Sequence, residues 1–118
     1  METVNEIKLK LLRQQLYDRS IEYADNRISL YLAQKGQCAV TGEKFILTEE
    51  IHCHHKIPKS KDDTDDYQNL ILVTATVHKL IHATNAETIQ KYLQACKPDF
   101  KKLNVLRQLV GNTILLVD

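Results

Sequence analysis

The sequence predicts an α+β fold, and three observations lead to that class. The chain has 118 residues, close to the commonest size of one domain. Apolar residues recur at three- and four-residue spacing towards both ends, as they do in amphipathic helices. Between them, residues 37–73 carry β-forming residues and turn signals instead. We therefore expect a single domain over residues 1–118, in which helices precede and follow a strand–loop–strand unit.

The N-terminal region, residues 1–36, is predicted to be helical. Apolar residues such as Ile7 and Leu11 follow one another at helical spacing. A further helical stretch covers residues 26–35, and Gly36 lies where a left-handed C-terminal cap would end it. The pattern leaves open whether one long helix or two occupy this region.

The central region, residues 37–83, is predicted to contain a hairpin followed by a helix. Residues 51–57 are rich in β-formers and histidine, and residues 70–73 form a short apolar run with β-branched side chains. The polar segment between them, residues 59–68, has the composition of a loop. Two strands joined by such a loop are expected to pair as an antiparallel hairpin.

Three helices are predicted after the hairpin. Thr74 is the expected N-cap of the first. The C-terminal region, residues 84–118, holds the other two. Thr84 with Glu87 three residues later has the pattern of a capping box and opens the second helix, and Asp99 opens the third.

The charge balance of the chain bears on its partners. Sixteen basic and fifteen acidic residues give a formal net charge of +1. A free-standing DNA-binding protein is usually more basic, because phosphate neutralisation supplies most of its non-specific affinity. The balance argues mildly against nucleic acid as the only partner, and it also suits a catalytic module that another component delivers to DNA.

Cysteine usage and hydropathy indicate the compartment. Cys38, Cys53 and Cys96 are odd in number and show no paired spacing, so no disulfide framework is predicted. No apolar leader follows Met1, and the longest apolar runs are too short to span a bilayer. We expect a soluble cytoplasmic protein with reduced thiols and no membrane partner.

All five histidines lie between His52 and His82, and they predict a metal site. His78 and His82 are four residues apart on a predicted helix, so both imidazoles project from one face. His54 on the preceding strand is the natural third ligand. Three protein ligands leave open positions for water and a phosphate oxygen, as a catalytic metal site requires.

Hydrolysis of a phosphodiester also needs a base that deprotonates water. A neutral imidazole with an ordinary pKa of ~6.5 suits that task. His55 follows a proposed ligand, and successive residues of a strand diverge, so His55 can serve as a base beside the metal. His52 is expected to be an exposed or edge-strand histidine and not a ligand.

The His54-His55 pair, Asn69, and the His78 and His82 pair together resemble the HNH family of nucleases, whose core is the ββα-metal (His-Me finger) fold. The resemblance implies that His55 is the general base. It implies that His54, His78 and His82 hold one divalent cation. It gives Asn69 the role of tying the two strands together and fixing the loop that carries the base.

The resemblance also implies a reaction and a cofactor. The reaction is hydrolysis of DNA to a 5′ phosphate and a 3′ hydroxyl, with nicking expected from a single site. Magnesium or manganese is the working ion, although three imidazoles bind zinc or nickel more tightly. Lys56, Lys59 and Lys61 are either a phosphate-contacting rim or part of a solvated loop whose aspartates neutralise them.

The stretch from residue 16 to about residue 111 resembles more specifically the C-terminal endonuclease domain of group II intron reverse transcriptase/maturases. The motifs that carry this likeness are residues 37–42, 52–58, 67–70 and 78–83. It implies double-stranded DNA, a reverse transcriptase/maturase and intron RNA as partners. Two features depart from the family: the paired cysteines of many relatives are missing, which argues against a structural zinc, and Asp62-Asp63 stands where relatives have two glycines.

Two alternatives remain open from the sequence. One is a metal-stabilised nucleic-acid-binding module of an intron ribonucleoprotein that does not cleave. The other is a protein-interaction module on a decayed nuclease scaffold, which the near-neutral charge permits.

Overall fold

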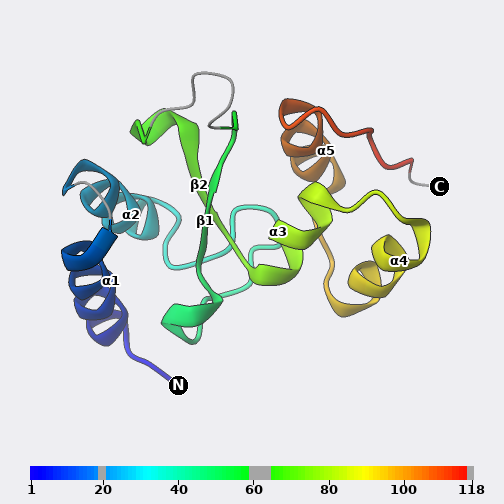
Figure 1. The fold of residues 1–118 in the computed structure, drawn as a ribbon. Helices are drawn as coiled ribbons and strands as arrows, with labels where there is room; N and C mark the ends of the chain where they lie inside the picture. The colour runs from blue at the N-terminus through cyan, green and yellow to red at the C-terminus, as the bar shows by residue number, and fades with distance from the viewer. Residues whose placement is uncertain (19–20, 59–64, 117–118) are drawn as a thin grey trace.

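The computed structural model describes residues 1–18, 21–58 and 65–116 of the chain. A two-stranded hairpin lies in the middle, with two helices on one side and three on the other (Figure 1). The elements in chain order are α1 (Val4–Asp18), α2 (Ile21–Ala33), β1 (His52–His55), β2 (Leu70–Val73), α3 (Ala75–His82), α4 (Ala86–Ala95) and α5 (Phe100–Leu109). The predicted α+β class, with helices at both ends of a β-hairpin, is confirmed.

The N-terminal region forms two helices, which resolves the alternative that the pattern left open. Ile7 and Leu11 of α1 are buried, as their spacing predicts. Helix α2 begins at Ile21 and not at residue 26, because its apolar face extends back to the buried Tyr23. Gly36 has a φ of +68°, and its N–H donates to the carbonyl of Tyr31 over 2.8 Å, so a left-handed residue ends this helix as expected.

The hairpin has the predicted antiparallel pairing, and it aligns His52 with Val73 and His55 with Leu70. Strand β2 covers the predicted residues 70–73, but β1 is shorter than the predicted 51–57. The reasons are local. The N–H of Ile51 donates to Thr48 in a 3₁₀ turn, and the N–H of Ile57 donates to a side chain and not to the facing strand.

The segment before the hairpin contains β-formers, yet among the described residues it makes only an isolated bridge between Gln37 and Lys44 and a 3₁₀ turn at Thr48–Glu50. Gln34, near the end of α2, pairs with the outer edge of β2 instead. Its side-chain amide accepts from the N–H of Leu72 over 3.1 Å and donates to the carbonyl of Leu72 over 2.9 Å. A side chain thereby satisfies backbone groups that a third strand would otherwise have bonded.

Helix α3 packs its apolar face into the core. Thr74 caps it, since its hydroxyl accepts from the N–H of Val77 over 3.3 Å, and the predicted cap is confirmed. The fully buried residues of this face are Val77, Leu80 and Ile81. They hold the adjacent, histidine-bearing face of the helix in a fixed orientation towards the hairpin.

The caps of α4 and α5 were predicted with mixed success. Helix α5 begins after Asp99, whose carboxylate accepts from the N–H of Lys102 over 3.2 Å, as expected. The prediction of a capping box that begins at Thr84 is wrong. Asn85 caps α4, because its side-chain oxygen accepts from the N–H groups of both Glu87 and Thr88. An asparagine one residue later offers the better-placed acceptor.

The C-terminal end of α3 is fastened by side chains from beyond α4. Arg107 is 1% exposed, and its guanidinium donates to the carbonyls of Leu80 and Ala83. Asn112 donates to the carbonyls of Ile81 and Ala83. The carbonyls that end a helix lack partners within the helix, so these donors replace water there and fix the helix in place. Among the described helices, none is long and apolar enough to cross a membrane.

Candidate metal centre and catalytic site

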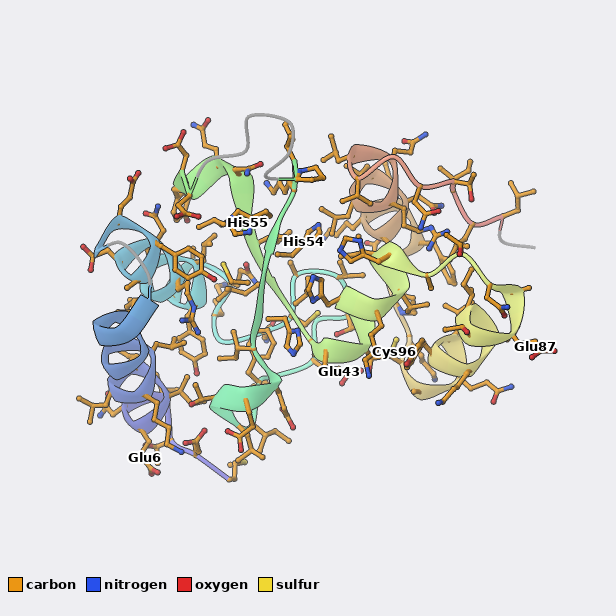
Figure 2. All side chains as sticks on the ribbon, in the orientation of Figure 1. Glu6, Glu43, His54, His55, Glu87 and Cys96 are labelled. Carbon is orange, nitrogen blue, oxygen red and sulfur yellow. The ribbon has the colours of Figure 1, made fainter. Side chains whose placement is uncertain are left out.

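Strand β1 separates two adjacent histidines. Successive side chains of a strand point to opposite faces, so His54 and His55 leave β1 in opposite directions. His54 turns towards α3, and its ring contacts those of His78 and His82. His55 turns towards α2, where its ring stacks on Tyr23. Figure 2 labels the two histidines on either side of the strand.

On the α3 side, three histidines form a compact cluster. One ring nitrogen from each of His54, His78 and His82 lies within 4.8 Å of the other two. The ring centroids are 5.2 to 5.4 Å apart, and each pair meets edge to face. The pair on α3 owes its common direction to the four-residue spacing, and the strand supplies the third nitrogen. The structure thus brings together the three predicted ligands.

Burial disfavours the protonated form of two histidines of this cluster, His54 and His78. His54 is 3% exposed, and desolvation together with the neighbouring histidines lowers its pKa from 6.5 to about 3. The pKa of His78 is lowered for the same reasons, burial first and then His82 and His52. Neutral imidazoles carry the lone pair that a metal ion needs.

A buried ring nitrogen of His54 indicates whether a cation would fit in this cluster. Nε2 of His54 is buried and has no hydrogen-bond partner among the described residues. Leaving a buried polar atom unsatisfied costs about 1–3 kcal/mol. A divalent cation bound by His54, His78 and His82 would satisfy that atom, so the donor set suits a metal.

A fourth histidine lies against the cluster. His52 is half-buried, and its Nδ1 lies 3.1 Å from Nδ1 of His78. Its ring meets the His78 ring edge to face, with centroids 5.2 Å apart. Burial, and then the charge of Lys79, lower its pKa. His52 lies in an edge strand and outside the three-histidine group, in line with the prediction, but its contact with the cluster was not predicted. A signal was present, because residues two apart in a strand share a face, so His52 follows His54 towards α3.

On the other face of β1, His55 is paired with a carboxylate. Its Nε2 lies 2.8 Å from Oδ1 of Asp65, and both side chains are partly exposed. Asp65 is itself held, since its carbonyl accepts from the side-chain amide of Asn26 on α2 over 2.8 Å. In the sequence Asp65 is one of several aspartates of the loop, and its contact with His55 was not predicted.

Asn69 joins the two ends of the hairpin loop. Its side-chain oxygen accepts from the N–H of Ile57 over 3.0 Å, and its side-chain amide donates to the carbonyl of Ile57 over 3.3 Å. Its own carbonyl accepts from the N–H of Lys56 over 2.8 Å. These bonds close the hairpin just beyond the strand pair and hold the backbone next to His55.

Of the three lysines considered as a phosphate-contacting rim, the structure describes only Lys56. Lys56 follows β1 directly and is half-buried. Lys59 and Lys61 lie outside the described residues, and so do Asp62 and Asp63.

The comparisons with known proteins gave one match, over the middle of the chain. Residues 38–84 match the family model of the HNH endonuclease. Neither the search of curated proteins nor that of solved structures gave a match. The matched segment contains the hairpin, α3 and all five histidines. The match covers 47 of the 118 residues, and this segment is therefore similar to an HNH endonuclease domain, which suggests a metal-dependent nuclease. The three-histidine cluster could hold the divalent metal that such domains bind.

Proposed function

We propose that the chain hydrolyses phosphodiester bonds of double-stranded DNA with the help of one divalent cation. His55 is the general base, and His54, His78 and His82 are the metal ligands. The observation that carries this proposal is that His54 and His55 leave β1 on opposite faces and enter different environments. His54 is buried and joins His78 and His82 in a cluster of three imidazoles, and His55 is paired with a carboxylate on a partly exposed face.

The carboxylate determines which nitrogen of His55 acts. An ionised Asp65 accepts a hydrogen bond, so Nε2 of His55 carries the proton that it donates. Nδ1 then holds the lone pair and takes a proton from the attacking water. The carboxylate stabilises the imidazolium that results, as an orienting acid does for other histidine bases.

The metal site supplies the second half of the chemistry. When bound, the cation stabilises negative charge on the phosphate and on the departing 3′ oxygen. His54, His78 and His82 are neutral donors, so the ion keeps its full positive charge. We propose magnesium or manganese as the working ion. Zinc or nickel bind imidazoles more tightly, and a purified sample can carry them.

Two further residues support the base and the substrate. Asn69 fixes the backbone beside His55 through its bonds to Ile57, and we assign it the role of positioning the base. Lys56 follows the base directly, where its charge can meet a phosphate, and we extend this rim to Lys59 and Lys61. In-line attack by water leaves a 5′ phosphate and a 3′ hydroxyl, and a single site cuts one strand at a time.

We also propose the setting in which the domain works. The motifs of the sequence resemble those of group II intron reverse transcriptase/maturases, so the partners are such a protein and its intron RNA, in the cytoplasm. In that setting RNA pairing chooses the target. The net charge of +1 supports this, because a domain with almost no net positive charge gains little non-specific DNA affinity of its own.

A plasmid assay tests the proposed function. Metal-stripped protein is incubated with supercoiled DNA, with manganese or magnesium added back, beside a His55→Ala variant. We expect wild type to nick the plasmid and the variant to be slower by about 10²–10⁴-fold, the usual contribution of a general base. Equal nicking by the two proteins would assign the base elsewhere or point to a contaminating nuclease.

A further inference from the structure

The fourth histidine has no role in the function proposed above. His52 lies two residues before His54 on the same face of β1, and its Nδ1 is 3.1 Å from Nδ1 of His78. It is not one of the three residues whose ligand nitrogens gather within 4.8 Å. His52 therefore contacts the cluster from outside, through one of its members.

A hydrogen bond between two neutral imidazoles has only two arrangements, since one nitrogen must donate and the other accept. If His52 donates, the Nδ1 lone pair of His78 is used and its Nε2 carries a proton. That ring then has no lone pair for a metal. If His78 donates from Nδ1, its Nε2 keeps the lone pair and can bind a cation. Metal binding without loss of the contact requires the second arrangement.

We propose that His52 is a positioning residue of the metal site. It accepts the Nδ1–H of His78, selects the tautomer of His78 that binds metal through Nε2, and fixes the orientation of that ring. This inference rests on the proposed function, because it assumes that His78 is a ligand.

The surroundings of the pair favour this role. His52 is held by its pairing with Val73 in the hairpin, and α3 is held by its buried apolar face and by Arg107, so neither ring is carried by a mobile segment. Partners that accept the second N–H of a ligating histidine typically contribute 10–100-fold to metal affinity. Such a partner is usually a carboxylate or a carbonyl, and here it is an imidazole.

The metal affinity of the apo-protein tests the inference independently of cleavage. Zinc and manganese titrations are compared for wild type, His52→Ala, His52→Gln and the control Gln90→Ala, which changes an exposed, uncharged residue of α4. We expect the alanine variant to bind about 10-fold more weakly. The glutamine variant recovers most of the loss, because its amide oxygen also accepts a hydrogen bond, and the control binds as wild type does.

Nitrogen NMR of the histidine side chains of wild type provides a second readout. We expect a protonated Nδ1 on His78 before and after zinc is added, with the zinc-induced shift at its Nε2. A zinc-induced shift at Nδ1 of His78, or at either nitrogen of His52, would overturn the inference. Because this measurement uses wild type alone, it tests the role of His52 even if the alanine variant does not fold.

The variants separate this inference from the metal site on which it rests. Unchanged affinity in His52→Ala, with a large loss in His82→Ala, refutes the role of His52 and keeps the site. Unchanged affinity in both variants refutes the site itself. A glutamine variant as weak as the alanine variant assigns the effect to ring packing and overturns the hydrogen-bond role.

Discussion

His54 and His55 are neighbours in the chain but lie in opposite environments. His54 is 3% exposed among other imidazoles, and its pKa falls to about 3. His55 is partly exposed and bonded to the carboxylate of Asp65. The difference comes from the two-residue period of a strand, which gives β1 one face towards α3 and another towards α2.

The two environments fit the two roles that we propose for these histidines. A metal ligand must be neutral, and burial disfavours the protonated ring of His54. A general base must take up a proton during the reaction, and His55 is partly exposed with the carboxylate of Asp65 2.8 Å from its Nε2. One dipeptide can serve both functions only because the strand separates it into two environments.

Removing the metal is the largest perturbation of the α3 face. We expect chelation to abolish nicking and to lower the melting temperature, because a ligand that binds only the folded state at 100 times its Kd stabilises that state by about 2.7 kcal/mol. His82→Ala should produce the same loss of metal-dependent stabilisation without a chelator. A melting temperature that does not respond to manganese in wild type would contradict the assignment of the cluster.

On the face of β1 towards α2, the corresponding test removes the charge of the Asp65 carboxylate. In Asp65→Asn, the side chain no longer carries the charge that stabilises protonated His55, and its amide can favour the wrong tautomer. We expect nicking at saturating manganese to fall by about 10²-fold, at the lower end of a general-base contribution. Metal affinity should stay within about twofold of wild type, since Asp65 is not among the three clustered ligands. Asp66→Asn, one residue further on, is the matched control, and the account fails here if both variants lose activity equally.

A smaller effect is expected in the stability of the metal-free protein at low pH. Folded His54 stays neutral down to about pH 3, whereas in the unfolded chain it takes up a proton near pH 6.5. The unfolded state therefore binds more protons between these values, and the free energy of unfolding falls as the pH is lowered. Between pH 7.5 and 5.5 the loss from His54 is about 1.4 kcal/mol.

Urea unfolding of wild type and His54→Gln at the two pH values measures this effect. The glutamine variant should lose less stability than wild type over the interval. It will still lose some, because the pKa of His78 is lowered too. Equal losses in the two proteins would show that His54 is not buried as a neutral ring.

Local sequence signals were sufficient for much of the fold and site. The bounds of β2, the cap at Thr74 and the common direction of His78 and His82 all depend on residues close together in the chain. His54 joins that pair from β1, as the resemblance to the HNH pattern implied. Strand alternation and helical spacing determine which way such side chains point, so sequence alone could place them.

The features that were missed depend on tertiary contacts or on competition between neighbours. Asp65 reaches His55 across the hairpin loop, and Asn26 on a distant helix helps to place it. No periodicity in the sequence distinguishes Asp65 from the other aspartates of that loop. Helix α4 was assigned to the wrong cap because Thr84 and Asn85 are both good capping residues, and only the path of the chain decides between them.

The most direct test of the account measures both functions in both neighbours. Manganese affinity and plasmid nicking are determined for His54→Ala and His55→Ala. We predict that His54→Ala binds manganese at least 10-fold more weakly and recovers part of its nicking when manganese is raised. We predict that His55→Ala binds manganese as wild type does and does not recover nicking at any concentration. Parallel loss of affinity in the two variants, or wild-type nicking by His55→Ala, would contradict the division of roles across β1.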